Sequence, residues 1–197
     1  MGEVYQHAGH YPSPPTLRFT LKGHQAKITS LSCSPSDPHI VSIATNSFLL
    51  VWYLPSAHKA RIALHTSSTL TCSLSPSNQF VAYGGLDNLC SMRSIQRPLS
   101  RVSLEGHLGY TTHVLYTSNE SIVSSSADCT CIHWDIESAK QKSTFLGHSA
   151  EVMSFSVCLG SNLLVSGSCD KTSRMYDLSE GTHIYTFEGH QSDINCV

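Results

Sequence analysis

The chain has 197 residues, of which 40% are hydrophobic, and a formal net charge of −2 at pH 7. This composition indicates a folded protein of one or two domains and excludes a disordered one. The nearly balanced charge and the pI of about 6.6 argue against nucleic-acid binding. The longest apolar run, FLLVWYL at 48–54, is too short to insert across a membrane.

The chain begins MGEVYQHAGHYPSPP, which lacks the charged and then apolar pattern of a secretion signal. We therefore expect a cytoplasmic protein whose eight cysteines are reduced. Residues 1–16 contain three prolines and almost no large aliphatic residue, so a disordered N-terminal tail is expected. LRFTLKG at 17–23 then resembles the outer strand of a sheet.

The rest of the chain is repetitive. A histidine returns every 41 or 42 residues, in the order His24, His65, His107, His148 and His190. An Asn or Asp follows 21 or 22 residues after each of the first four, namely Asn46, Asp87, Asp128 and Asp170. Six residues further on stand Trp52, Arg93, Trp134 and Tyr176. A glycine-histidine start and a Trp-Asp end with this period mark a four-stranded blade of a WD-repeat β-propeller.

The repeat predicts an all-β fold over residues 17–197. The blades span approximately 24–64, 65–106, 107–147 and 148–189, and 190–197 begins a fifth. In the fourth blade we expect strands at 151–159, 163–169, 172–178 and 184–189; the inner strands of the others fall at 28–34, 70–76 and 113–118. Closed propellers have about four to eight blades, so four blades either close tightly or leave an open arc with two exposed faces.

The stretch SSADCTCIHWDI at 125–136 allows a second interpretation. Cys129, Cys131, His133 and Asp135 occupy alternate positions, so on one strand they would share a face, and all are ligand types that suit zinc. The same positions in the other repeats carry apolar or small groups such as Leu49 and Met92. We therefore expect a packed third strand and neither a metal nor a cofactor.

The recurring histidines and carboxylates could also be taken for catalytic groups. A catalytic group is normally made once per domain, whereas these pairs recur in every blade, so a structural hydrogen-bond network is expected and an enzyme is not. The network residues are His24, His65, Asp87, His107, Asp128, Trp134, His148 and Asp170. A strand hydroxyl such as Ser124 or Ser166 extends the network to the Trp N–H. Asn46 lacks the charge, so blade one should be held less tightly than blades three and four.

At this level of detail the chain resembles the β subunit of heterotrimeric guanine-nucleotide-binding proteins, a WD-repeat family. The resemblance is carried by LKGHQAKI (21–28), VAYGGLDNLCS (81–91), VSSSADCTCIHWDIES (123–138), LVSGSCDKTSRMYDLSEG (164–181) and FEGHQSDIN (187–195). It runs from about residue 17 to the end, over the first four of the family's seven blades and the start of the fifth.

The resemblance implies a protein without catalytic chemistry that presents one end of the propeller to a G protein α subunit and to effectors in receptor signalling. The residues that carry over to this binding face are Lys27, Leu86, Asn88, Tyr110, Met153, Asp193 and Asn195, with Glu151 in place of an Asp. Thr29, Ser68 and Leu70 replace a Tyr, a Trp and a Met. Because Tyr and Trp are common binding hot spots, weaker or altered α-subunit binding is expected.

Two departures bear on a γ subunit. Residues 1–16 show no heptad pattern, and the family's last three blades are not seen, so γ-subunit binding is not expected. Location at the inner face of the plasma membrane would come only through partners. The alternatives are a WD-repeat scaffold for other signalling proteins, or a truncated isoform without independent activity.

Overall fold

The computed structural model describes residues 20–34, 36–56, 58–64, 68–97 and 100–197. Four antiparallel sheets of four strands follow one another along the chain, and in each the strands pair in sequence order. The prediction of an all-β chain with four propeller blades is confirmed. The one helical segment in these ranges is a short 3₁₀ turn, η1 Leu54–Ser56, and none of their helices could span a membrane.

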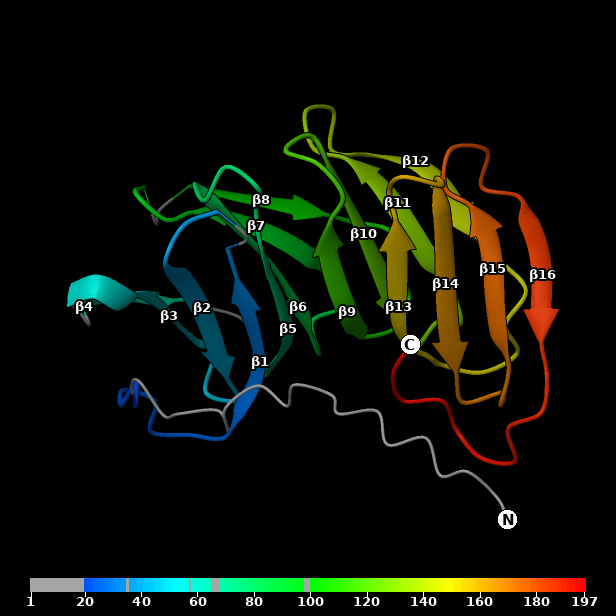
Figure 1. The fold of residues 1–197 in the computed structure, drawn as a ribbon, viewed down its shortest axis with the longest axis horizontal. Helices are drawn as coiled ribbons and strands as arrows, with labels where there is room; N and C mark the ends of the chain where they lie inside the picture. Colours follow the sequence, from blue (N-terminus) through cyan, green and yellow to red (C-terminus); the bar gives the residue numbers. More distant parts are fainter. Residues whose placement is uncertain (1–19, 35, 57, 65–67, 98–99) are drawn as a thin grey trace, which may run out of the picture.

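Each sheet is one blade (Figure 1). Blade 1 contains β1 Ile28–Cys33, β2 His39–Ala44, β3 Phe48–Tyr53 and β4 His58–Ala63. Blade 2 contains β5 Thr69–Leu74, β6 Phe80–Gly85, β7 Cys90–Ser94 and β8 Arg101–Leu104. Blade 3 contains β9 Thr111–Tyr116, β10 Ser121–Ser126, β11 Cys131–Asp135 and β12 Lys140–Phe145. Blade 4 contains β13 Val152–Cys158, β14 Leu163–Ser168, β15 Ser173–Asp177 and β16 His183–Phe187.

Three apolar clusters fill the spaces between successive blades. Alternate residues of a strand point to opposite faces of its sheet, so one strand serves two clusters. On β10, Ile122 packs in the cluster with blade 2 and Val123 in the cluster with blade 4. Every residue of β10 is buried, because its sheet is covered on both faces.

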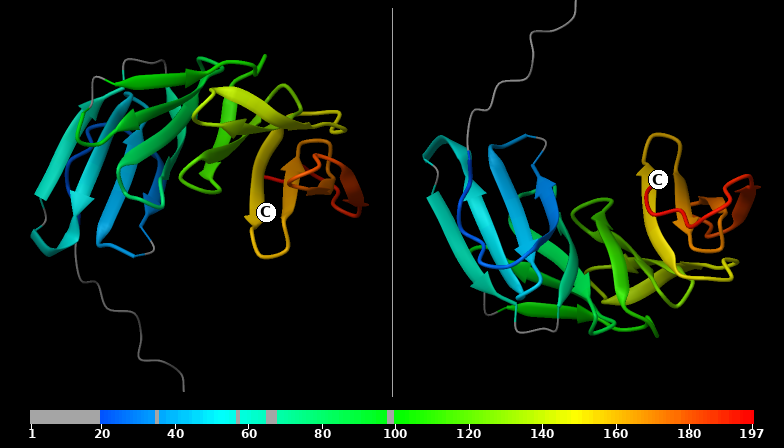
Figure 2. Two further views of the ribbon diagram at one scale, coloured as in Figure 1. Left: turned by 90° about the horizontal axis from the view of Figure 1, so that it is seen from above. Right: turned by 90° about the horizontal axis from the view of Figure 1, so that it is seen from below.

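The blades form an open arc and do not close into a ring (Figure 2). The two end sheets therefore keep apolar side chains in contact with water. On blade 1, Ile28 and Leu31 are 48% and 62% exposed. On blade 4, Tyr185 and Phe187 are 57% and 45% exposed, and their ring centroids lie 4.9 Å apart.

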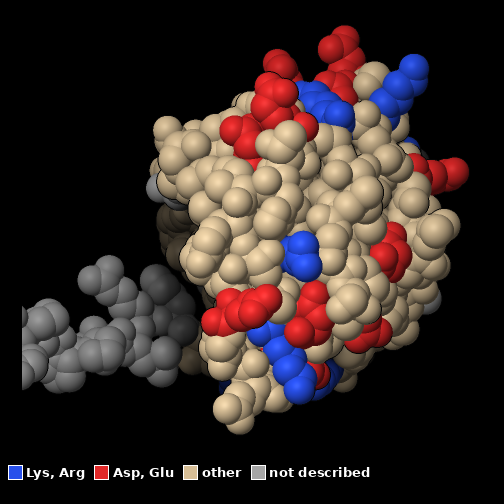
Figure 3. All heavy atoms as spheres, turned by 90° about the vertical axis from the view of Figure 1, so that its right-hand side faces the viewer, with Lys and Arg blue, Asp and Glu red and all other residues tan. Residues whose placement is uncertain are grey.

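Charged side chains are sparse over the middle of the molecule's blade 4 side. Figure 3 shows acidic and basic groups gathered toward the two ends of this side, with a broad area between them that carries few charges.

Two expected strands are not formed. Thr20–Gly23, the described part of the 17–23 stretch, is irregular, as is 190–197. The final segment still lies against blade 4, where Ile194 N–H donates to Ser168 O (3.1 Å) and Val197 N–H donates to Ser154 Oγ (2.9 Å). It lacks the partner strands of a further sheet, so it runs beside β13 without pairing into a ladder. The predicted tail at 1–16 lies outside the described residues.

Candidate functional site

The residues carried over by the resemblance gather at one end of the arc, which we call the candidate face. It is the end at which β1, β5, β9 and β13 begin, at the bottom of Figure 1. Lys27, Tyr110 and Glu151 directly precede three of these strands, and Met153 is the second residue of β13. The others lie in the β6–β7 turn and in the final segment, namely Leu86, Asn88, Asp193 and Asn195.

Backbone hydrogen bonds hold the loops of the candidate face. The amide of each turn after a second strand donates to the carbonyl of the loop before the inner strand. The four pairs are Thr45 N to Lys27 O (2.9 Å), Leu86 N to Ser68 O (3.1 Å), Ala127 N to Tyr110 O (3.0 Å) and Cys169 N to Glu151 O (2.9 Å). The same pattern in blade after blade makes the face a rigid surface.

The structure brings some of these side chains together and keeps others apart. Tyr110 Oη donates to Glu151 Oε1 (3.1 Å), which links blades 3 and 4. Asn88 Nδ2 donates to Leu108 O (3.4 Å), which links blades 2 and 3. Lys27 and Asp193 are exposed and belong to opposite ends of the arc (Figure 2). Three of the candidate residues, Asn88, Tyr110 and Glu151, therefore also connect neighbouring blades.

Leu108 is a member of the candidate face that sequence reasoning missed. It follows His107 directly and is 88% exposed. Its carbonyl accepts from Asn88 of the β6–β7 turn, in which Leu86 is 51% exposed. The signal for it was present. At the position after the blade histidine the other described repeats have Gln25, Ser149 and Gln191, so an apolar residue there departs from a polar pattern.

One position of each turn between the second and third strands has a left-handed backbone. Ser47, Asn88, Cys129 and Lys171 have φ values of 58°, 62°, 69° and 70°. Such values are uncommon for residues other than glycine, and their return at each repeat shows that the turn imposes them. Cys129 is therefore a turn residue, and the prediction that it lies on the third strand is wrong.

The remaining residues of that stretch pack as predicted. β11 begins at Cys131, which is buried in the cluster between blades 3 and 4. Burial raises the pKa of the Cys131 thiol, which disfavours the thiolate that a metal needs. Within the described ranges no three His, Cys, Asp or Glu side chains are grouped as metal ligands.

The network of blade 3 is complete. The ring nitrogens of His107 lie 2.8 Å from Asp128 Oδ2 and 2.8 Å from Ser124 Oγ, and Trp134 Nε1–H donates to the same hydroxyl (2.7 Å). Asp128 also accepts from the Leu108 amide (2.9 Å). Burial of Asp128 acts to raise its carboxyl pKa, but the hydrogen bonds from His107 and other donors outweigh it and hold the pKa well below its usual range.

Blade 4 repeats most of this arrangement. His148 Nδ1 lies 2.8 Å from Asp170 Oδ2, and its Nε2 lies 2.6 Å from Ser166 Oγ. Tyr176 replaces the Trp, and its hydroxyl donates to Leu146 O (3.2 Å). Burial of the His148 ring lowers its pKa, although Asp170 acts in the opposite direction.

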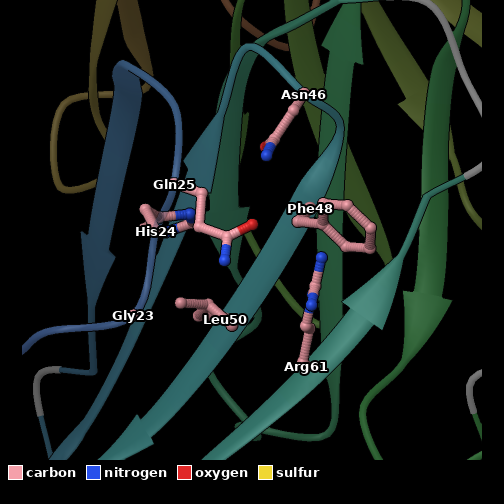
Figure 4. Close-up of a pocket in the computed structure, with 7 residues that line it drawn as sticks. All are labelled: Gly23, His24, Gln25, Asn46, Phe48, Leu50 and Arg61. Atoms are coloured by element: carbon pink, nitrogen blue, oxygen red, sulfur yellow. The ribbon is translucent and has the colours of Figure 1, made fainter.

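Blade 1 has only half of the network. His24 Nε2 lies 2.7 Å from Ser42 Oγ, and Trp52 Nε1–H donates to that hydroxyl (2.9 Å). No described residue bonds to the buried His24 Nδ1, and Figure 4 shows the Asn46 side chain on the turn, directed toward the hollow that it lines together with His24. The hollow between them measures about 10 Å³, room for one water molecule at most.

Blade 2 uses a different set of groups. His65 lies outside the described residues. Arg101, on the outer strand, donates to Ser91 Oγ (3.0 Å) and lies 3.6 Å from Asp87 Oδ2. Arg93 stands where blades 1 and 3 have Trp, and it donates to Ala63 O of the preceding blade (2.8 Å). In blade 2 a guanidinium thus connects the turn carboxylate of Asp87 with a hydroxyl of the third strand, Ser91.

We predict that Asp128→Asn lowers the free energy of unfolding by about 1.5–3 kcal/mol, because it removes a charge-assisted hydrogen bond with His107. Denaturant titration measures the change. Glu137→Gln is the matched control: Glu137 is an exposed residue of the turn after β11 in the same blade, so a change of at most about 0.5 kcal/mol is expected. Equal losses in the two variants would contradict a special role for Asp128.

Asn46→Asp should stabilise blade 1 by about 1 kcal/mol, since a carboxylate can approach His24 Nδ1 as Asp128 approaches His107. Thermal unfolding and hydrogen exchange of β1 and β2 measure the gain. Asn195→Asp adds the same charge at an exposed position and controls for it. A loss of stability in Asn46→Asp alone would contradict the assignment of the His24 nitrogen as the missing donor.

Stability should fall in two stages as the pH is lowered. The lowered pKa of His148 means that its contribution is complete above the unfolded value of about 6.5 and is lost below it. The lowered pKa of Asp170 means that its contribution is lost only below about pH 4. His148→Gln should flatten the change in unfolding free energy between about pH 7 and 5; an unchanged slope would contradict this origin.

The comparisons with known proteins agree with the repeat. Residues 15–52, 99–135 and 139–177 match the WD domain, G-beta repeat family. The guanine nucleotide-binding protein subunit beta of Arabidopsis thaliana is 39% identical over 197 residues, which covers 90% of this chain and 52% of that protein. The protein of the same name from Oryza sativa subsp. japonica is 37% identical over 196 residues, covering 90% and 51%.

The beta-2 subunit of Nicotiana tabacum is 38% identical over 194 residues, covering 90% of this chain and 52% of that protein. The chain thus spans about half the length of these curated relatives. The family match, the period of the blades and the four four-stranded sheets lead to one assignment. The chain belongs to the WD-domain, G-beta-repeat family and is a G-protein-β-like WD-repeat protein.

Proposed function

We propose that the chain is a non-catalytic, G protein β-like protein that presents its candidate face to a G protein α subunit and to effectors in receptor signal transduction. One observation carries this proposal. The eight residues that the resemblance assigns to partner binding come from all four blades and the final segment, yet they lie at the same end of the arc. We place the protein in the cytoplasm, at the inner face of the plasma membrane only through its partners.

The chemistry of the candidate face supports protein binding. Lys27, Asp193 and Asn195 are exposed polar groups, and Leu86 and Leu108 are exposed apolar ones. Apolar contacts surrounded by polar groups are the usual make-up of a protein–protein interface. Because backbone hydrogen bonds fix the loops, little ordering entropy is lost on binding.

Burial of the His–Asp–Ser groups supports a protein without catalytic chemistry of its own. Ser124 and Ser166 have an exposed fraction of 0%, and each of these hydroxyls already contacts a histidine. A nucleophile must reach the substrate, and these hydroxyls face the interior of the sheets. Their geometry is repeated in two blades, as expected for scaffolding.

A scaffold for other signalling proteins is the second candidate, and one feature favours it. Thr29, Ser68 and Leu70 stand where the resemblance places large side chains. Thr29 Oγ1 donates to Thr69 O of blade 2 (2.9 Å), so this hydroxyl joins two blades. The blade 1 and 2 part of the face is therefore smaller and less aromatic than the family's pattern, which would suit a different partner.

Calorimetric titration of the purified chain with a purified, GDP-loaded α subunit tests the proposal. We expect Lys27→Ala and Asp193→Ala each to weaken binding about tenfold, which is about 1.4 kcal/mol. Glu120→Ala is the control, because this exposed residue lies between β9 and β10 at the opposite end of the arc. A folded chain that does not bind the α subunit would contradict the proposal and would favour the second candidate, a scaffold for other signalling proteins.

A further inference from the structure

Neighbouring inner strands are joined by a repeated hydrogen bond. A backbone amide of one inner strand donates to a side-chain hydroxyl on the inner strand of the preceding blade. We call the contact between two successive blades a joint, and this bond occurs twice at each of the first two joints. The pairs, given as amide and hydroxyl, are Cys72 with Ser30 (3.2 Å), Leu74 with Ser32 (3.0 Å), Val114 with Thr71 (3.1 Å) and Tyr116 with Ser73 (3.1 Å). These bonds use amides that point away from the blade's own ladder.

The joint between blades 3 and 4 departs from this pattern. His113 and Leu115 occupy the two hydroxyl positions on β9, and among the described residues no β13 amide donates to either side chain as the β9 amides donate to Thr71 and Ser73. The pattern resumes on blade 4, where Ser154 accepts from the Val197 amide (2.9 Å). The departure is therefore confined to one joint.

The end of the arc opposite the candidate face shows the same difference. Asn78 Nδ2 donates to Asp37 Oδ2 across the first joint (2.7 Å), and the Ser77 amide donates to Asn119 Oδ1 across the second (2.9 Å). In blade 4, Asn162 instead bonds Asp177 of its own sheet (3.1 Å). The described residues of the third joint thus show no such bond at this end.

Near the candidate face, two side-chain hydrogen bonds connect blades 3 and 4 across the third joint. Thr112 Oγ1 donates to Val152 O (2.6 Å), and Tyr110 Oη donates to Glu151 Oε1 (3.1 Å). Farther out in the blades, the rings of Phe145 and Tyr176 pack with centroids 5.3 Å apart. Blades 3 and 4 are therefore connected by hydrogen bonds near the candidate face and by apolar packing that includes Leu115 and Val157. Their described residues lack the amide–hydroxyl bonds that connect the other neighbouring inner strands.

His113 lies at the first of the two positions on β9 that lack a hydroxyl. Its ring lies 4.8 Å from that of Phe155 on β13, and its buried Nδ1 bonds no described residue. Burial lowers the pKa of His113, and a hydrogen bond to the Phe155 backbone acts in the opposite direction.

No charged group compensates for a proton on this ring. The strands around it, β9, β10, β13 and β14, contain no Asp, Glu, Lys or Arg. Their other titratable groups are Tyr116, which faces blade 2, and Cys158, which is exposed. The nearest carboxylate at the joint, Glu151, precedes β13 and is bonded to Tyr110.

We propose that the joint between blades 3 and 4 is a proton-sensitive hinge. When His113 takes up a proton, the inner strands β9 and β13 separate at the end remote from the candidate face, while the Thr112 and Tyr110 contacts hold the other end. The closed joint favours the neutral ring, so it is most stable above about pH 6.5 and weakens as the pH falls below that value. This inference does not depend on the proposed function.

Hydrogen exchange of the whole chain, corrected for the intrinsic effect of pH on exchange, tests the hinge at about pH 7.5 and 5.5. We expect protection of the Phe155 and Val157 amides, which correspond to those of Cys72 and Leu74, to fall about tenfold, because a solvated imidazole is about 90% protonated at the lower pH. The amides of Cys72, Leu74, Val114 and Tyr116 report the other two joints and should change much less. An equal loss at all three joints would overturn the proposal.

Three variants distinguish the effect of protonating His113 from the effect of changing the packing of its side chain. His113→Gln cannot titrate and should lose the pH response, and His113→Thr should also raise protection at both pH values by restoring the hydroxyl of Thr71. His133→Met is the control: burial also lowers the pKa of His133 on β11, yet this variant should keep the wild-type response. A response retained in His113→Gln overturns the hinge. If that variant does not fold, as seen by circular dichroism, the comparison of joints in the unaltered chain decides.

Discussion

Each blade must cover the apolar face of the next, and the rest of the structure depends on this contact. A single four-stranded sheet with two apolar faces cannot be stable in water, whereas stacked sheets bury both faces. Blades 2 and 3 are covered on both sides, which is why β10 is wholly buried. Burial of one large aliphatic or aromatic side chain contributes about 1.5–3 kcal/mol, so the uncovered faces of blades 1 and 4 represent a substantial loss of stability.

Stacking of the sheets does not by itself fix the conformation of the loops; the polar networks do so. The buried carboxylates of Asp128 and Asp170 hold both the loop after the histidine and the turn after the second strand. These are the segments that make up the candidate face. Function and stability are thus connected in this family member: weakening a buried pair loosens the surface that we propose partners contact, without touching any exposed residue.

The repeat made much of the fold predictable, because period and strand alternation report directly on stacking. It could not show that Cys129 is a turn residue, since a left-handed backbone is set by the geometry of the turn and not by the alternation of side chains. Nor could it show that Arg101 contacts Asp87 and Ser91 in blade 2, because that contact depends on the outer strand's register. The candidate face was predictable only through the resemblance; Leu108 was missed, although an apolar residue after the blade histidine departs from the polar residues of the other described repeats.

The central claim is that stability comes from blade stacking, and residue-resolved hydrogen exchange near neutral pH tests it most directly. The account predicts that the second and third strands of blades 2 and 3, β6, β7, β10 and β11, exchange slowest, because their sheets are covered on both faces. The strands of blades 1 and 4 should exchange markedly faster. Equal protection in all four blades, or greatest protection in the end blades, would contradict the account.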